Sequence, residues 1–439
     1  MTTIQAPEAD IAIGIEHYAT STPGCDGILR STPEDFFVEE IYEERGYEGG
    51  KYLILSVEKR NWDTHHLIRE LSRQLKISQK RVSFAGTKDK KAVTRQRLCI
   101  SGLKPEEIDK IHLADVRLKV LGSTNRSIGL GDLLGNRFKI TIRNLTCPDS
   151  EGTFSKISEE ISRLRGVPNY FGVQRFGDTR PVTHLVGEAL VKGDTEGAVM
   201  TYLAKPFPGE LEATRSAREA LREAGDFKGA LKSFPRYLHY EIAMLNYLVE
   251  HPGDFAGSFD VLAPSLKRLF VHAYQSYLFN RILSRRLSFG LTLNRAMEGD
   301  VVCFSKGDLP DISKLQVVTA DNLDAINRLM EHGRAHITLP LLGYESRIGP
   351  GPEGDIERSV LEDEGLGAAP SRLEGFRVPK NTELGSKGLR RSVLLRVSPR
   401  YVVRTDFAEL EFFLPAGSYA TVVLREFMKS GSLITDQRS

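Results

Sequence analysis

The alternation of hydrophobic and polar positions predicts strands in the first 150 residues. Residues 136–144, NRFKITIRN, alternate strictly, and residues 51–59, KYLILSVEK, alternate well enough for a strand. This pattern is typical of an antiparallel sheet that has one face on a core and the other toward solvent or a ligand. In 136–144 the second face is basic, with Arg137, Lys139, Thr141 and Arg143.

Between these two strands the pattern changes to the helical period. Residues 63–76, DTHHLIRELSRQLK, place Leu67, Leu71 and Leu75 on one stripe, and Asp63 or Thr64 can cap the start. The outward face carries the basic residues Arg69, Arg73 and Lys76. The sequence therefore predicts a basic helix just before residue 80.

After about residue 168 helix signals dominate, as in residues 238–250 and 265–287. Strand alternation returns in residues 392–399 and 408–415, and a helix-like stretch follows at 420–429. The chain therefore combines helices and strands, an α/β (α+β) composition.

The order of strands, helices and strands indicates an insertion. We expect one discontinuous domain of residues 1–168 and 386–439. The second domain, residues 169–385, is then inserted into it.

Composition agrees with a soluble globular protein, because 40% of the 439 residues are hydrophobic and 27% are charged. The first residues lack a basic start followed by an apolar run, and no stretch of the ~20 apolar residues needed to cross a bilayer is present. We expect a cytoplasmic protein with no membrane partner.

The four cysteines lie far apart and form no CxxC pair. This spacing argues against a structural zinc site and against a disulfide framework. We expect reduced and mostly buried thiols at Cys25, Cys99, Cys147 and Cys303.

The net charge of +2 hides a strong local asymmetry. Residues 51–97 contain thirteen Lys or Arg and four acids, a local charge of +9. Such a block is consistent with one local anionic partner, although a solvated helix face explains it equally well from charge alone.

Within this block, residues 84–96, FAGTKDKKAVTRQ, set Asp89 among four cations. The aspartate either balances charge in exposed ion pairs or is a reactive group on a surface that holds a polyanion. Common alternatives for chemistry are missing: the sequence contains no GxxxxGK[ST] phosphate loop and no GxSxG elbow, and His65 and His66 are adjacent rather than on one helical face.

Six stretches together resemble the TruD family of pseudouridine synthases, and they span nearly the whole chain. They are TPEDFFVEE (32–40), GTKDKKAVTRQ (86–96), GNRF (135–138), VPNYFGVQRFG (167–177), AYQSYLFNRIL (273–283) and LPAGSYATVVLREFMK (414–429).

The resemblance implies the pseudouridine synthase fold, a mainly antiparallel mixed sheet with the TRUD domain inserted. It implies an enzyme that isomerises uridine to pseudouridine in RNA, typically uridine 13 of transfer RNA, without a metal or a small-molecule cofactor. We expect a monomer whose partner is tRNA.

The resemblance also implies roles for single residues. Asp89 takes the position of the catalytic aspartate, and Arg30 stands where the family often has lysine. A nearby guanidinium favours the charged form of a carboxylate. An extruded base recovers stacking on an aromatic ring, for which Phe138 is the best match, and Asn136 can hold the loop or hydrogen-bond near the base.

Several of these roles have alternatives. Arg30 could pair with Glu34 or Asp35 instead of Asp89, and Phe138 could belong to the core, which its periodicity favours. Aromatic residues of 167–177 could stack on bases or simply pack. The residues that we expect to bind RNA are Lys88, Lys90, Lys91, Arg95, Arg69 and Arg73. The competing functions are a non-catalytic RNA-binding protein and a small-molecule lyase, of which the lyase leaves the +9 block unexplained.

Overall fold

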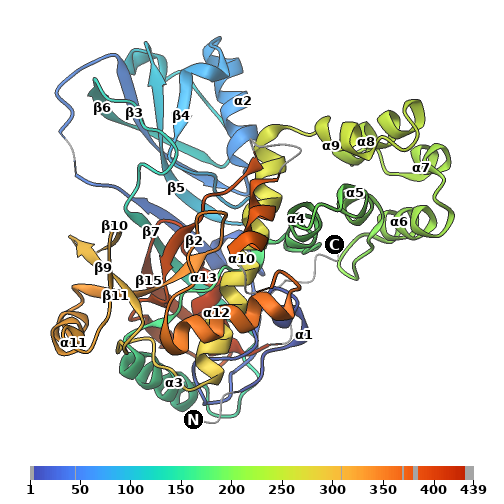
Figure 1. Ribbon diagram of the computed structural model, residues 1–439. Helices are drawn as coiled ribbons and strands as arrows, with labels where there is room; N and C mark the ends of the chain where they lie inside the picture. Colours follow the sequence, from blue (N-terminus) through green and yellow to red (C-terminus); the bar gives the residue numbers. More distant parts are fainter. Residues whose placement is uncertain (1–3, 45, 308, 368–369, 379–383, 431–439) are drawn as a thin grey trace. The chain divides into compact units, whose positions relative to one another are not determined.

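The chain folds into two compact units in a computed structural model (Figure 1). The first, here called the sheet unit, comprises Thr22–Val167 and the chain from Leu395 onward. The second, the helical unit, comprises the segment up to Ser21 and Pro168–Leu394. The structure describes residues 4–44, 46–307, 309–367, 370–378 and 384–430.

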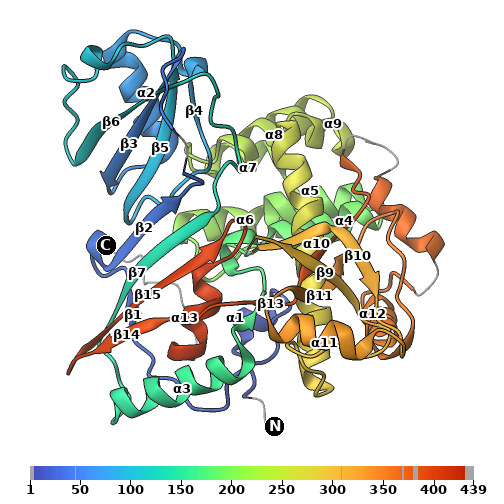
Figure 2. The same cartoon turned by 90° about the vertical axis from the view of Figure 1, so that its left-hand side faces the viewer.

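The sheet unit is built on a nine-stranded sheet whose main path runs β14-β15-β7-β2-β5-β3-β6 (Figure 2). β1 pairs with β7 and β4 with β5, off this path. β2 and β5 run parallel, whereas the other described neighbours run antiparallel. The mainly antiparallel mixed sheet expected from the sequence is therefore present. The strands are β1 (Ile28–Leu29), β2 (Phe36–Ile41), β3 (Tyr52–Arg60), β4 (Val82–Phe84), β5 (Val93–Ser101), β6 (Val116–Thr124), β7 (Gly135–Arg143), β14 (Arg400–Val403) and β15 (Phe407–Pro415).

Helix α2 (Thr64–Leu75) covers the part of the sheet formed by β3 and β5. Its stripe of Leu67 and Leu71 packs against Leu55 and Leu98 in one apolar cluster. The carboxylate of Asp63 accepts the backbone N–H of His66 at 2.9 Å, which caps the helix start as the sequence predicts.

Helices α3 (Ser150–Leu164) and α13 (Ala420–Met428) pack together beside β14, toward the opposite edge of this sheet (Figure 2). The ring of Phe154 lies 5.0 Å from that of Phe427 and 5.7 Å from that of Tyr401. The α2 layer and the α3–α13 layer therefore pack on different parts of the sheet.

The two faces of the sheet differ as the alternation in β7 predicts. Phe138, Ile140 and Ile142 are buried, and the basic residues point to the other face. That face is not simply basic, however, because acids on neighbouring strands neutralise it. The ion pairs are Arg137–Glu39 at 3.5 Å, Lys139–Glu409 at 3.0 Å, Arg95–Glu39 at 2.9 Å and Arg95–Glu58 at 2.7 Å.

The helical unit combines many helices with a four-stranded antiparallel sheet of order β10-β9-β11-β12. Helix α10 is the long central helix of this unit and packs on α4, α12 and β11 (Figure 1). The elements are α1 (Glu8–Ile11), α4 (Thr183–Val191), α5 (Thr195–Ala204), α6 (Glu212–Ala224), α7 (Phe227–Ser233), α8 (His239–Glu250), α9 (Phe255–Asp260), α10 (Pro264–Ser288), β9 (Val301–Lys306), β10 (Leu309–Val317), α11 (Leu323–Glu331), β11 (Ala335–Leu341), α12 (Gly351–Asp363) and β12 (Leu389–Ser392). The chain passes between the units after Ser21, within β8 (Val167–Pro168) and within β13 (Leu394–Leu395).

The N-terminal segment belongs by its contacts to the helical unit, whereas the sequence placed it with the catalytic domain. Asn280 donates to the carbonyl of Ile13 at 2.9 Å, and Ser284 donates to the carbonyl of Gly14 at 2.9 Å. Polar groups on α10 therefore attach the segment by its backbone, a contact that the side-chain pattern of the segment does not reveal.

The aromatic residues of 167–177 are packed. Tyr170, Phe171 and Phe176 are all buried, and Phe171 meets Phe279 edge to face at 5.5 Å. Their contacts favour packing over stacking on bases, the two readings that the sequence left open.

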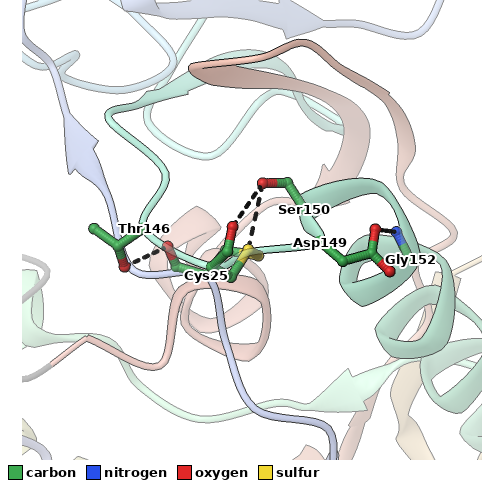
Figure 3. The surroundings of a disulfide bond; sticks show 6 residues. Cys25, Thr146, Asp149, Ser150 and Gly152 are labelled. Atoms are coloured by element: carbon green, nitrogen blue, oxygen red, sulfur yellow. Dashed lines mark hydrogen bonds between the residues drawn. A yellow bond between two sulfur atoms is a disulfide. The ribbon is translucent and has the colours of Figure 1, made fainter.

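Two cysteines form a disulfide, which corrects the expectation of four reduced thiols. Cys25 is bonded to Cys147 across a sequence separation of 122 residues (Figure 3). The backbone brings them together, because Thr146 donates its N–H to the carbonyl of Cys25 at 2.9 Å. The spacing of cysteines along the chain could not predict this disulfide, because its two residues meet only in the folded structure. Cys99 and Cys303 are free and buried.

In the described part of the chain, no helix has both the length and the apolar character required to cross a membrane. Nor do the described residues contain a group of three or more His, Cys, Asp or Glu side chains placed to hold a metal ion.

Candidate active site

Asp89 lies in a loop of residues 85–92 that joins β4 to β5, here called the Asp89 loop. Thr64 at the start of α2 accepts the backbone N–H of Lys88 at 3.0 Å. The side-chain amide of Gln96 on β5 makes two hydrogen bonds. Its Nε2 donates to the carbonyl of Gly86 at 3.2 Å, and its Oε1 accepts from the Thr64 hydroxyl at 3.3 Å. The first turn of α2 and a buried strand residue therefore hold the backbone on the N-terminal side of Asp89.

Asp89 and Arg30 form an ion pair. Arg30 Nη2 donates to Asp89 Oδ2 at 2.6 Å, with the carboxylate side chain 47% exposed and the arginine side chain 20% exposed. The sequence left open whether Arg30 pairs with Glu34 or Asp35, and the structure gives these acids other partners. The ion pairs are Arg60–Glu34 and Arg143–Asp35.

An aromatic layer supports the arginine. The guanidinium carbon of Arg30 lies 4.1 Å from the centre of the Phe36 ring, which meets Phe138 edge to face at 6.3 Å. Phe138 in turn stacks on Phe412 at 5.5 Å. Arg30 and Phe138, two residues chosen from the sequence, are thus connected through Phe36.

Phe138 is mostly enclosed by this layer, with 7% of its surface exposed. Its packing agrees with the core alternative that its periodicity favours. Sequence reasoning did not single out Phe36, although it lies in the 32–40 stretch and follows Arg30 closely. The available signal was an aromatic residue, Phe36, close in sequence to the candidate cation Arg30.

Asn136 lies on the same face of β7 as Phe138 and opposite Glu40 in the β2–β7 ladder. Its side-chain oxygen is buried and has no hydrogen-bond partner among the residues that the structure describes. A buried acceptor without a partner is costly, so such atoms in native structures call for an explanation. A donor supplied by a bound molecule would satisfy it.

Glu40 is a buried carboxylate that the sequence analysis did not single out. Lys88 Nζ lies 2.5 Å from its Oε1, and the Tyr42 hydroxyl donates to its Oε2. Burial, followed by the Glu40 charge, raises the pKa of Tyr42 above its ordinary value, which keeps the phenol protonated as a donor. The Lys88–Glu40 pair fixes the loop to β2.

The six residues expected to bind RNA fall into two groups. Lys90 and Lys91 are exposed beside Asp89. Arg69 and Arg73 are exposed on α2, where the Glu70 carboxylate lies 3.9 Å from Arg69 and 3.0 Å from Arg73. The other two contact acids of the protein. Lys88 points inward to Glu40, and Arg95 lies on the sheet face away from α2, in ion pairs with Glu39 and Glu58. Both residues therefore have carboxylate partners, and their contact with RNA stays a prediction.

The site thus presents one accessible carboxylate in a braced loop, a cation against it, an aromatic layer and an unsatisfied amide oxygen. This arrangement suits a nucleophile or base that must stay ionised next to a flat polar ring.

Comparison with known proteins gives a consistent result over the full chain. The family model described as tRNA pseudouridine synthase D (TruD) matches residues 12–427. A protein of Methanosarcina mazei named a probable tRNA pseudouridine synthase D is 50% identical over 440 residues, covering 98% of this chain and 99% of its own length. A protein of Archaeoglobus fulgidus with the same name is 41% identical over 422 residues, covering 95% and 98%.

A solved structure agrees with these relatives. The crystal structure of a candidate tRNA pseudouridine synthase D (TruD) from Methanosarcina mazei superposes with a TM-score of 0.86 at 50% identity, covering 97% of this chain and 99% of its own. The chain therefore belongs to the tRNA pseudouridine synthase D (TruD) family and is an enzyme, an isomerase of the pseudouridine synthase class.

Proposed function

We propose that this protein converts uridine to pseudouridine in transfer RNA, at uridine 13, with Asp89 as the reacting carboxylate and without a cofactor. The observation that carries the role of Asp89 is its accessible carboxylate, paired at 2.6 Å with Arg30 in a loop braced from α2 and β5. The choice of uridine 13 rests on the resemblance to the family. The proposal includes a monomer that works in the cytoplasm.

The reaction is an isomerisation, so it needs no energy source. The C1′–N1 glycosidic bond of uridine breaks, the uracil turns, a C1′–C5 bond forms, and the C5 proton is lost while N1 gains a proton. An ionised carboxylate beside C1′ and C6 serves as nucleophile or base in this sequence. Arg30 directs the carboxylate, since its Nη2 donates a charge-assisted hydrogen bond to Asp89 Oδ2 at 2.6 Å.

The uridine must leave its stack to reach Asp89, at a cost of a few kcal/mol. We propose that the unpaired Oδ1 of Asn136 accepts the N3–H of the uracil. Phe138 supplies part of the apolar wall through its contact with Phe36. Because only 7% of its surface is exposed, Phe138 can contact the side of the base but cannot stack over its face.

Exposed cations near Asp89 provide contacts for the phosphate backbone. Lys90 and Lys91 flank the carboxylate in the loop, while Arg69 and Arg73 extend the positive surface along α2. Phosphate contacts position an RNA and carry little sequence information. This surface therefore holds the RNA but does not choose the uridine.

The substitution Asp89→Asn tests the chemistry. We expect the rate of tritium release from 5-tritiated uridine in RNA to fall by at least about 10²-fold, because an amide is neither base nor nucleophile. RNA affinity should stay within a few fold, since the shape is kept and the charge removed would repel phosphate. The exposed Asp109 is a matched control, and Asp109→Asn should leave both quantities unchanged. Substantial activity of Asp89→Asn would remove Asp89 from its role.

The position of the modification is tested separately by treating a mixed tRNA pool and mapping pseudouridine by position. Pseudouridine at position 13 supports the proposal, and modification confined to other positions overturns the choice of uridine 13. A non-catalytic RNA-binding protein would leave every position unchanged.

A further inference from the structure

Lys59, at the end of β3, is a fully buried cation, with 0% of its surface exposed. A lysine inside a protein ordinarily needs a carboxylate partner. Among the described residues, no carboxylate lies within ion-pair distance of Lys59. Its ammonium instead donates to three backbone carbonyls: that of Trp62, that of Asp89 at 3.1 Å and that of Lys88 at 3.5 Å.

These bonds reach both peptide units that flank the Asp89 α-carbon. The carbonyl of Lys88 belongs to the peptide before it, and the carbonyl of Asp89 belongs to the peptide after it. The orientations of these two peptides set the direction of the Asp89 Cα–Cβ bond, and with it the place of the carboxylate. The next peptide back, between Thr87 and Lys88, is held as well, since the Lys88 N–H donates to the Thr64 hydroxyl at 3.0 Å.

An ammonium has three N–H donors, which match the three carbonyls in number. The third carbonyl, that of Trp62, lies in the turn between β3 and α2. One side chain thus connects a strand end, the turn before α2 and the Asp89 loop. No apolar residue could replace these bonds, because the carbonyls would then lose their buried donors.

We propose that Lys59 is a positioning residue for catalysis, which holds the backbone of the Asp89 loop so that the carboxylate meets the uridine in reactive geometry. This inference rests on the proposed role of Asp89. Lys59 does not touch the RNA, because it is enclosed beneath the loop.

The charge state of Lys59 gives the role a pH signature. Burial lowers its pKa to about 8, and the charge of Lys88 acts in the same direction. Asp63 and Asp89, the acids that face it from the turn before α2 and from the loop, oppose this. Above about pH 8 the neutral amine has two N–H donors for three carbonyls, so the loop loses one of its attachments.

The first test replaces Lys59 by Met, which keeps the length and removes the donors. We expect Lys59→Met to lower the single-turnover rate constant at saturating RNA by roughly 10- to 100-fold, since a displacement of ~1 Å can cost ~10²-fold. The dissociation constant for RNA should change by less than a few fold. The control is Lys119→Met, on the exposed face of neighbouring β6, which should leave both quantities unchanged.

The second test uses Lys59→Arg, which stays charged at all accessible pH values. The wild-type single-turnover rate should fall above about pH 8, and in Lys59→Arg this fall should move to higher pH. If Lys59 only supported the fold, its replacement would change the melting temperature and the active fraction. It would not change the pH at which the rate begins to fall, the alkaline limb of the pH profile. The pH profile also decides the matter if Lys59→Met does not fold.

Two results would overturn the inference: a folded Lys59→Met protein with a rate constant within twofold of wild type, or an alkaline limb that Lys59→Arg does not move. Asp89→Asn is assayed in parallel. If Asp89→Asn is active, the proposed function itself fails. If Asp89→Asn is inactive while Lys59→Met resembles wild type, the positioning role alone fails.

Discussion

At the scale of single residues, Arg30 has an unusual backbone. Its φ of 56° lies in the left-handed region, which costs a residue with a side chain roughly 1–2 kcal/mol. In this conformation its guanidinium contacts both the Asp89 carboxylate and the Phe36 ring. The site therefore holds the arginine against a local preference, as expected where a charge must be placed for chemistry.

Replacing Arg30 by Met should lower the single-turnover rate constant by about 10- to 100-fold, the equivalent of one charge-assisted hydrogen bond of ~1.5–3 kcal/mol. Arg30→Lys should retain most of the rate, because it keeps the charge, and lose some because it lacks the planar fork. The measurement is tritium release at saturating RNA.

The control for this series is Arg60→Met, which breaks the exposed pair with Glu34. Exposed ion pairs contribute little, so this variant should behave as wild type. If Arg30→Met matched Arg60→Met, the pair with Asp89 would have no part in the reaction.

Sequence reasoning selected Asp89 and Arg30 but could not decide between three acids as partners for the arginine. Glu34 and Asp35 are near Arg30 in sequence, whereas Asp89 is 59 residues away and is nevertheless its partner. Lys59 escaped notice for a different reason. Its partners are backbone carbonyls, which every residue carries, so no residue type marks the contact.

At the scale of elements, some cations of the sheet unit are paired with acids and others are not. The sheet face away from α2 is here called the outer face. On the outer face Arg95 and Arg137 are neutralised by strand partners, while the Asp89 loop leaves Lys90 and Lys91 exposed. Local charge counts treat these residues alike. The pairing register between strands decides which of them remain available to RNA.

The double substitution Lys90→Ala and Lys91→Ala should weaken binding of all RNAs alike. Each lost phosphate contact should reduce the slope of log K against log salt by about 0.7 to 0.9. The measurement is a set of binding titrations over a range of salt concentrations.

A matched control removes two charges from the outer face, as Arg117→Gln with Lys119→Gln on β6. Both side chains are exposed, and Arg117 pairs with Glu58 at 3.3 Å, so their loss should leave the salt slope unchanged. Equal slopes for wild type and the Lys90, Lys91 double variant would mean that the loop lysines face away from the RNA.

Element types were predictable where a short pattern decides them. The alternation in β7 and β15, the leucine stripe of α2 and its Asp63 cap all appear as the sequence predicts. Residues 392–399 read as one strand, yet the chain forms β12 up to Ser392 and the separate β13 at Leu394–Leu395. Their pairing partners lie far away in sequence, so local pattern could not reveal the break.

At the scale of the whole molecule, His184 on α4 affects stability from inside the helical unit. It stacks on Tyr277 at 5.1 Å and meets Phe176 edge to face at 5.2 Å. Burial lowers its pKa from 6.5 to about 4, a direction opposed by its hydrogen bond to the backbone of Ala12. The folded protein therefore keeps His184 neutral where the unfolded chain would be protonated.

The unfolded state binds more protons than the folded state between pH 6.5 and about 4. The free energy of unfolding should consequently be highest above pH 6.5 and decrease as the pH falls, by up to about 3 kcal/mol from this group. His184→Phe keeps an aromatic ring and should flatten this dependence in urea unfolding at pH 7.5 and 5.0. The exposed His332 is the control, and His332→Asn should leave the slope as in wild type. An unchanged slope in His184→Phe would contradict the prediction.

The sequence indicated a discontinuous domain, but not that the first residues belong with the helical unit. The attachment of Ile13 and Gly14 through their carbonyls to α10 could not be predicted, since carbonyls leave no pattern. The same limit hid the disulfide, whose cysteines are 122 positions apart.

The disulfide has a topological consequence. The chain from Cys25 to Cys147 is a closed covalent ring, and Arg30, Lys59, Asp89 and Phe138 all lie on it. A protease that cuts the chain once between Cys25 and Cys147 divides the protein into two fragments, which the disulfide still joins. Such a nicked molecule would migrate as an intact chain until a reductant separates the pieces, and every residue of the site would stay tethered to the others.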